Sequence, residues 1–241
     1  MESDNNASLS QSMPDLNTHL SFGNTDVTNL DMEEIVNVTI LVDTSGSMSS
    51  HAAELNQQIS DFIKWMQDFH QAPKLFLSLG RFDSDIEVLT GFQQVNNVKT
   101  RVFPTDGGST KLYEGCSEFV KNVVAQQQRA LGAGILSKSI FFVITDGEDN
   151  ASKATSASEV KQLINFIQSD EATMNTFASA LVGIGNRNEF EHAQQEMGIQ
   201  KLFVIDPSLS EKENKKAFKE VFGWLSASVS SASTQPGALV F

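Results

Sequence analysis

The residues best suited to chemistry in this 241-residue chain are oxygen-bearing side chains that directly follow an apolar run. Residues 38–42 are apolar and rich in β-branched types, which is typical of a strand buried on both faces of a sheet. Asp43, Ser45 and Ser47 follow at alternate positions of a glycine-containing loop. In open α/β sheets, ligands bind beyond the carboxyl ends of the strands, so a site is expected at this loop. One carboxylate and two hydroxyls are hard oxygen ligands, which suit Mg²⁺, Ca²⁺ or Mn²⁺ rather than zinc.

The same spacing has a second interpretation. Serine and aspartate are also the residues that cap helix N-termini, and a helical pattern follows the loop at residues 52–70. Spacing alone does not choose between a metal loop and a helix cap. Evidence from elsewhere in the chain is needed to separate them.

Two further stretches carry oxygen ligands of the same kind. Residues 105–113 form a glycine-rich loop with hydroxyl side chains ahead of a helical pattern. Residues 140–145 are a second buried strand, which an aspartate and a glycine follow directly. Together with the first loop, these stretches resemble the von Willebrand factor type A family and its metal-ion-dependent adhesion site. The resemblance implies a metal site made of Asp43, Ser45, Ser47, Thr110 and Asp146.

Hydrophobic periodicity predicts a regular alternation of strands and helices from residue 35 onward. Strands are expected at residues 36–42, 75–82, 86–89, 140–145, 175–184 and 202–205, with the third forming a hairpin with the second. Helices are expected at residues 52–70, 112–128, 157–167, 189–197 and 210–225, and Ser210 and Glu213 open the last in a capping-box pattern. This alternation predicts an α/β fold with a doubly wound, mostly parallel six-stranded sheet. The resemblance covers residues 35–227 and implies a Rossmann-like strand order of 3-2-1-4-5-6 with strand 3 antiparallel.

The pattern predicts one domain with a polar segment at each end. Residues 1–34 are acidic and rich in serine and asparagine, and we expect them to be disordered or loosely docked through Leu16, Leu20 and Phe22. Residues 35–228 form the type A-like domain. Residues 229–241 are expected to be a Ser-rich tail, whose apolar last four residues could dock on this domain or on another protein.

Composition argues against several classes of partner. The formal charge of −13 disfavours nucleic acid and anionic membrane surfaces, and no run approaches the roughly twenty apolar residues of a membrane helix. The single cysteine, Cys116, excludes an internal disulfide framework and is expected to be buried. No lysine or arginine precedes Lys64, so a secretory signal is not expected, and we predict a cytoplasmic location. The sequence carries no signal for an oligomeric state.

The residues near the predicted site favour binding over catalysis. The turn at Gly183 and Gly185 lacks the third glycine of a dinucleotide site, so we interpret it as a tight strand-to-helix turn. His51 is the only histidine near the site, and we expect it to be a solvated residue at a helix start. The resemblance implies a non-enzymatic module in which a bound Mg²⁺, Ca²⁺ or Mn²⁺ ion takes up an Asp, Glu or C-terminal carboxylate of a protein partner. The alternative is a magnesium-dependent hydrolase or phosphotransfer enzyme with Asp43 as nucleophile.

Overall fold

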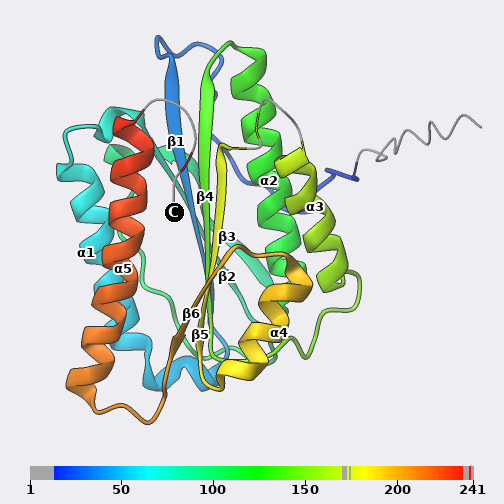
Figure 1. Cartoon of the computed structure of the whole chain (residues 1–241), viewed down its shortest axis with the longest axis vertical. Helices are drawn as coiled ribbons and strands as arrows, with labels where there is room; N and C mark the ends of the chain where they lie inside the picture. Colours follow the sequence, from blue (N-terminus) through cyan, green and yellow to red (C-terminus); the bar gives the residue numbers. More distant parts are fainter. Residues whose placement is uncertain (1–13, 170–172, 174, 236–238, 240–241) are drawn as a thin grey trace, which may run out of the picture.

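Six strands form one mixed sheet with helices on both of its faces (Figure 1). The computed structural model describes residues 14–169, 173, 175–235 and 239. The strands lie in the order β3-β2-β1-β4-β5-β6, and every neighbouring pair is parallel except β2 and β3. This confirms the expected strand order and the antiparallel third strand.

The strands are β1 (Glu34–Asp43), β2 (Leu75–Phe82), β3 (Ile86–Gln94), β4 (Leu136–Thr145), β5 (Phe177–Ile184) and β6 (Lys201–Ile205). The helices are α1 (Ala52–Asp68), α2 (Leu112–Gly132), α3 (Ala157–Ser169), α4 (Arg187–Met197) and α5 (Glu211–Thr234).

Strand β1 lies at the centre of the sheet, which explains its unbroken apolar run. It pairs with β2 on one side and with β4 on the other. Val36, Val38 and Ile40 belong to a core cluster with residues of α1 and α5, whereas Ile35 and Leu41 belong to a second cluster with residues of α2, α3 and α4. Both faces of the strand are therefore covered, and its last residue ends inside the protein rather than at its surface.

The helices divide into two layers on opposite faces of the sheet (Figure 1). Helices α1 and α5 pack together on one face, and α2, α3 and α4 cover the other. Cys116 of α2 is fully buried in the second layer, as the sequence predicted, and burial raises the pKa of its thiol. Within the described part of the chain, no helix is both long enough and apolar enough to span a membrane.

Residues 14–33 run as an arm across α2 and the outer edge of β3. Phe22 packs edge-on against Phe119 of α2, with 5.0 Å between ring centroids. The Thr25 N–H donates to the Phe92 carbonyl of β3 at 2.7 Å, and the Phe92 N–H donates to Asn24 Oδ1 at 2.8 Å. These bonds satisfy backbone groups of an edge strand that would otherwise lack partners. The arm is thus docked over this range, whereas residues 1–13 lie outside the described residues.

Helix α5 is longer than its sequence pattern indicated. We predicted its end at residue 225 and a tail from residue 229, but the helix continues to Thr234. Val229 and Ala232 are buried in the core that α5 shares with the sheet, so the apolar spacing runs on through the Ser-rich stretch. Serine side chains accommodate the helix, because Ser226 and Ser228 donate to the carbonyls four residues earlier. Serine-rich composition therefore concealed a helical period.

The residues after α5 return to the domain. Leu239 packs against the core cluster between α5 and the sheet, and its N–H donates to the Asn175 carbonyl at 2.7 Å. The other residues of the predicted apolar terminus, 238 and 240–241, lie outside the described residues.

A buried lysine joins the C-terminal end of α5 to the sheet. The Lys138 side chain of β4 has no exposed surface, and its Nζ donates to the Ala232 and Gln235 carbonyls at 2.8 and 2.7 Å. The same Nζ lies 2.8 Å from Glu34 Oε2. An ammonium group has three hydrogens to donate, so all three are used. The positive charge also lies at the negative end of the helix dipole, where it is stabilising.

We predict that Lys138→Met destabilises the protein by about 3 kcal/mol, because it keeps the aliphatic stem but leaves Glu34 and the carbonyls of Ala232 and Gln235 without their partner. Urea denaturation measures this loss as a shift in midpoint at constant slope. Lys64→Met, on the exposed side of α1, is the matched control and should change stability by less than about 0.5 kcal/mol. Equal losses in the two variants would contradict the bridging role.

Candidate functional site

The three loops of the candidate site meet at the carboxyl edge of the sheet. Asp43 is the last residue of β1, and Asp146 directly follows β4, its parallel neighbour. The loop before α2 is joined to the β1 loop by a β-bridge between Ser45 and Gly107, and the Gly107 N–H donates to the Thr44 carbonyl at 3.1 Å. Parallel strand order therefore brings together segments that are more than one hundred residues apart in the chain.

Four of the five expected residues form one continuous chain of hydrogen bonds. The Ser45 N–H donates to Asp43 Oδ1 at 2.8 Å. The hydroxyl oxygens of Ser45 and Ser47 lie 3.1 Å apart, and Ser47 Oγ donates to Asp146 Oδ1 at 2.8 Å. The two carboxylates are thus linked through the backbone N–H of Ser45 and the hydroxyls of Ser45 and Ser47.

Thr110, the fifth residue, is held against this chain by the loop that follows β4. Its N–H donates to Asn150 Oδ1 at 2.8 Å, and its carbonyl accepts from the N–H groups of Asn150 and Ala151 at 3.1 and 3.2 Å. A β-carbon built on Gly147 would lie 3.8 Å from Thr110 Oγ1, so this hydroxyl lies close to the residue after Asp146. Among the described residues, the Thr110 hydroxyl has no hydrogen-bond partner.

The five side chains range from the interior to the surface. Asp43, Ser45 and Thr110 are buried, with 0, 3 and 4% of their surface exposed. Asp146 is half-buried and Ser47 is exposed. The set therefore opens to solvent on one side, where a molecule in solution can reach it.

The ionised form of both carboxylates is disfavoured by their surroundings in the site. Burial raises the pKa of Asp43, and the nearby Asp146 charge adds to this effect, against the hydrogen bonds from Thr145 and Ser45. Burial likewise raises the pKa of Asp146, against the hydrogen bond from Ser47 and the charge of His51. Two partly desolvated acids at one site are the arrangement that a bound cation stabilises.

A family model for the von Willebrand factor type A domain matches residues 37–221, which is most of the chain. The chain belongs to the von Willebrand factor type A domain family. Domains of this family are generally protein-interaction modules and typically not enzymes. No match was found among curated proteins.

Solved structures share the fold of this type A domain at low sequence identity. The D319A mutant of the PilB minor pilin from Streptococcus sanguinis is 12% identical with a TM-score of 0.53, and the similarity covers 86% of this chain and 65% of the pilin. The pilus adhesin SpaC from Lactobacillus rhamnosus GG is 11% identical with a TM-score of 0.57, covering 80% of this chain and 30% of the adhesin. Proximal thread matrix protein 1 from the mussel byssus is 18% identical with a TM-score of 0.50, covering 79% and 48%. This chain therefore spans less than two thirds of each of these proteins.

The donor set of this type A domain fits a hard divalent cation. Among the described residues, no three His, Cys, Asp or Glu side chains gather to hold a metal ion, so a site rich in charged or nitrogen ligands is not offered. The five-residue set offers two carboxylates and three hydroxyls instead. A hydroxyl that donates its hydrogen keeps lone pairs for a cation, which applies to Ser47. The Thr110 hydroxyl has no partner within the part of the chain that the structure describes. Oxygen donors of this kind suit Mg²⁺, Ca²⁺ or Mn²⁺.

His51 is buried, so the expectation of a solvated histidine was wrong. Only 9% of its surface is exposed, and its Nδ1 lies 3.5 Å from Asn214 Nδ2 of α5. Burial lowers the pKa of the imidazole, against the charge of Asp146. The covering helix is more than 150 residues away in the sequence, so local pattern gave no signal of this contact.

Asp83 ties two of the site loops together, a role that the sequence analysis did not assign. The Thr44 hydroxyl donates to Asp83 Oδ2 at 2.9 Å, and the Lys111 N–H donates to the Asp83 carbonyl at 3.1 Å. A β-carbon on Gly107 would come within 2.4 Å of Asp83 Oδ2, so only glycine fits against this carboxylate. Asp83 thus fixes the β1 loop and the Thr110 loop relative to each other.

The loop after β4 also caps the helix that follows Thr110. The Tyr113 N–H of α2 donates to Asp149 Oδ1 at 3.1 Å, and the Glu114 N–H donates to Ser152 Oγ at 3.0 Å. In return, Glu114 Oε1 accepts from the Lys153 N–H at 2.7 Å. The first turn of a helix leaves its N–H groups without intrahelical partners, and here a distant loop supplies them. Because the cap is not next to the helix in sequence, spacing rules cannot detect it.

The glycine turn after β5 packs directly against helix α4. A β-carbon on Gly183 would lie 2.2 Å from the ring of Phe190, so that ring rests directly on the strand backbone. Asn186 caps α4 by accepting from the Asn188 N–H at 3.0 Å. This agrees with the interpretation as a tight strand-to-helix turn.

We predict that Asn150→Ala speeds hydrogen exchange at the Thr110 amide by about two- to tenfold, because the variant removes one hydrogen bond worth about 0.5–1.5 kcal/mol. Exchange followed by mass spectrometry or NMR measures this locally. Asn96→Ala, at an exposed position away from the three loops, is the control and should leave the Thr110 amide unchanged. An unaltered exchange rate in Asn150→Ala would show that the loop is held by other contacts.

Proposed function

We propose that this type A domain binds a protein partner through a divalent cation, Mg²⁺ or alternatively Ca²⁺ or Mn²⁺. The residues that would hold the cation are Asp43, Ser45, Ser47, Thr110 and Asp146. When bound, the cation supplies a coordination position for a carboxylate of the partner. The observation that carries the proposal is the pair of partly desolvated carboxylates, Asp43 and Asp146, which Ser45 and Ser47 link at the open edge of the sheet.

The number of donors supports a role in binding. Mg²⁺ prefers six oxygen ligands in near-octahedral geometry, whereas this set offers five side chains. One position is then left for an oxygen from outside the chain. Because Ser47 is exposed and Asp146 is half-buried, that position would be on the solvent side, within reach of a partner. An aspartate or glutamate side chain, or a C-terminal carboxylate, has the charge and the hard oxygens that such a position favours.

The surroundings of Asp43 argue against the alternative of a hydrolase or phosphotransfer enzyme. A carboxylate nucleophile needs a free oxygen that can reach the substrate. Asp43 has no exposed surface, and its Oδ1 and Oδ2 accept from the Ser45 N–H and the Thr145 hydroxyl. Turnover of a phosphate ester that disappears in Asp43→Asn would favour the enzyme nonetheless.

A cytoplasmic location for the binding event stays a prediction.

We predict that Mg²⁺ raises the melting temperature of the wild-type protein but not that of Asp43→Asn. A ligand that binds only the folded state adds about 2.7 kcal/mol at one hundred times its dissociation constant. For a domain of this size that is about 5–10 °C. Differential scanning calorimetry with millimolar Mg²⁺ or with chelator measures the shift.

Asp43→Asn is a suitable variant because its shape fits the site. The asparagine Oδ1 can accept from the Ser45 N–H, while its amide donates to Thr145 Oγ1, whose hydrogen can turn to the Gly147 carbonyl 3.0 Å away. Removing one of two like charges relieves repulsion, so in chelator the variant should melt at or above the wild type. An absent shift in the wild type, or an equal shift in the variant, would show that these residues are not the metal site.

Thr110→Ala should weaken Mg²⁺ binding by about tenfold or less and not abolish it, because the two carboxylates and both serines remain. Isothermal titration calorimetry gives the dissociation constants of wild type and variant. Complete loss of binding in Thr110→Ala would contradict the assignment of the acids as the main ligands.

The partner itself can be sought by affinity capture. Proteins that bind through the cation should be retained by the wild type in Mg²⁺ and released by chelator. Immobilised Asp43→Asn, whose folding the melting experiment checks, should not retain them. A set of retained proteins that is the same in all three conditions would contradict metal-dependent binding.

A further inference from the structure

A group of lysines lies beside the candidate site, at the start of α5. This helix follows β6, which is parallel to β5 and β4, so it begins at the same carboxyl edge of the sheet as the site. Asn214 of its first turns lies against His51, whose charge interacts with Asp146. The first turns of α5 thus flank the site on the α1 side.

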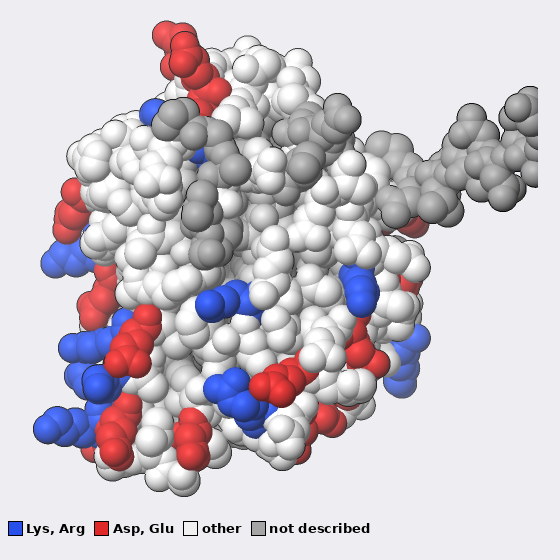
Figure 2. Space-filling view, viewed as in Figure 1, with Lys and Arg blue, Asp and Glu red and all other residues white. Residues whose placement is uncertain are grey.

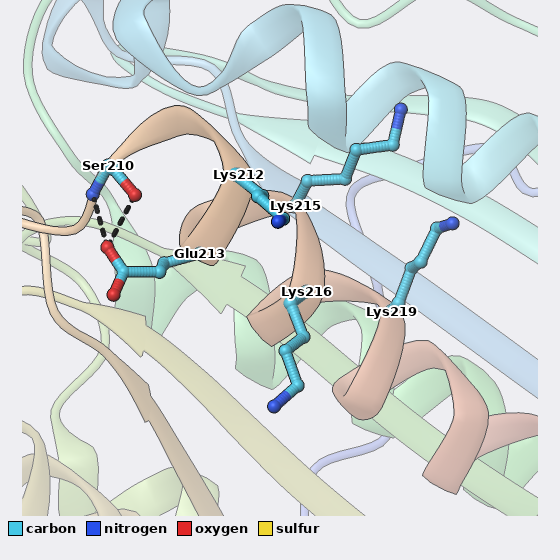
Figure 3. Close-up of a pocket in the computed structure, with 6 residues that line it drawn as sticks. All are labelled: Ser210, Lys212, Glu213, Lys215, Lys216 and Lys219. Atoms are coloured by element: carbon cyan, nitrogen blue, oxygen red, sulfur yellow. Dashed lines mark hydrogen bonds between the residues drawn. The ribbon is translucent and has the colours of Figure 1, made fainter.

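Four lysines follow one side of this helix. Lys212, Lys215, Lys216 and Lys219 are spaced at i, i+3, i+4 and i+7, and with Ser210 and Glu213 they line a hollow on the surface (Figure 3). All four are exposed. Further round the helix, Phe218 and Val221 are buried in the core. We call these four residues the lysine stripe.

The lysine stripe is only partly neutralised by nearby acids. Lys216 lies 3.6 Å from Glu220, which is exposed, and Lys215 lies 4.0 Å from Glu54, which is partly buried. Among the described residues, Lys212 and Lys219 form no ion pair. Glu213 is turned back to Ser210, from which it accepts two hydrogen bonds as the helix cap (Figure 3).

The start of α5 is more basic than the rest of the molecule. Residues 211–220 carry four lysines and three glutamates, whereas the whole chain has a formal charge of −13 and only 17 lysines and arginines. Figure 2 shows basic side chains along the lower left of the molecule, where α5 begins, with acidic ones between them. The loops joined to Thr110 and α2 carry the exposed acids Asp85, Asp106 and Glu148 instead. An anionic segment near the site would be repelled on that side and attracted over α5.

We infer that the lysine stripe is a second contact for the partner, and that it binds an acidic peptide segment next to the carboxylate that the metal site takes up. This rests on the proposed function. The stripe is about 10 Å long at 1.5 Å per helical residue, which matches about three residues of extended chain. The partner therefore carries a run of about three aspartates or glutamates close to its metal-binding carboxylate. The stripe sets the orientation of the bound segment toward α1 and α5.

Two labelled peptides test this by fluorescence anisotropy on the full chain. One has ten residues with an aspartate near its amino end, three consecutive glutamates near its carboxyl end and an amidated terminus. The other replaces the glutamates by glutamines. In Mg²⁺ at low salt, the glutamate peptide should bind the wild type about tenfold more tightly. Replacement of all four stripe lysines by glutamine, which keeps helix propensity, should remove this preference.

The control variant replaces Lys64, Lys74, Lys99 and Lys201 by glutamine, which changes the net charge equally at positions outside the stripe. It should keep the preference for the glutamate peptide, and loss of the preference here as well would overturn the inference. A preference that persists in the stripe variant, or a failure of the glutamate peptide to bind the wild type, would also overturn it. A ten-nucleotide single strand that binds the stripe as tightly would overturn the assignment to an acidic peptide.

Chelator separates this inference from the proposed function. If binding depends on Mg²⁺ but the glutamates add nothing, the stripe is not a contact and the metal site stands. If the glutamate preference depends on the lysines but is unchanged by chelator, the stripe is a contact and metal-dependent binding fails.

Discussion

The structure depends on a carboxylate placed at the end of a strand that is covered on both faces. Because β1 is the central strand between two helical layers, Asp43 leaves the sheet without leaving the interior. A charge in that position needs donors, and Thr145 and Ser45 provide them. The negative charge of the nearby Asp146 carboxylate disfavours the ionised form of Asp43 further, so Asp43 needs these donors more. The position of a single acid thus determines which side chains must surround it and makes a cation the natural counter-charge.

The sequence was informative where one local pattern determines the result. Apolar β-branched runs identified the buried strands, and the small oxygen-bearing residues after them identified the edge at which Asp43, Ser45 and Asp146 meet. Contacts between distant loops were not accessible in the same way. Asp83 and Asn150 look like ordinary turn residues, and their roles appear only once the Thr110 loop lies against them. The burial of His51 likewise depends on α5, which no local rule connects to it.

Composition misled where spacing was the better guide. The Ser-rich stretch after residue 225 suggested a tail, yet Val229 and Ala232 continue the apolar period of α5 into the core. In the N-terminal segment, polar composition left disorder and docking both open, and the packing of Phe22 on α2 decides for docking over the described residues. In both segments a few apolar side chains at suitable positions decide the structure, since burial of a valine or phenylalanine side chain contributes about 1.5–3 kcal/mol.

The arm across β3 has a consequence for how copies of this sheet can meet. Asn24 and Thr25 occupy the backbone groups of Phe92, so the chain itself covers this part of one outer edge. At the other outer edge, no backbone hydrogen bond among the described residues reaches the free side of β6. Strand addition is therefore hindered at the Phe92 part of β3 and unhindered along β6. Two copies would thus meet more readily through their β6 edges than through β3.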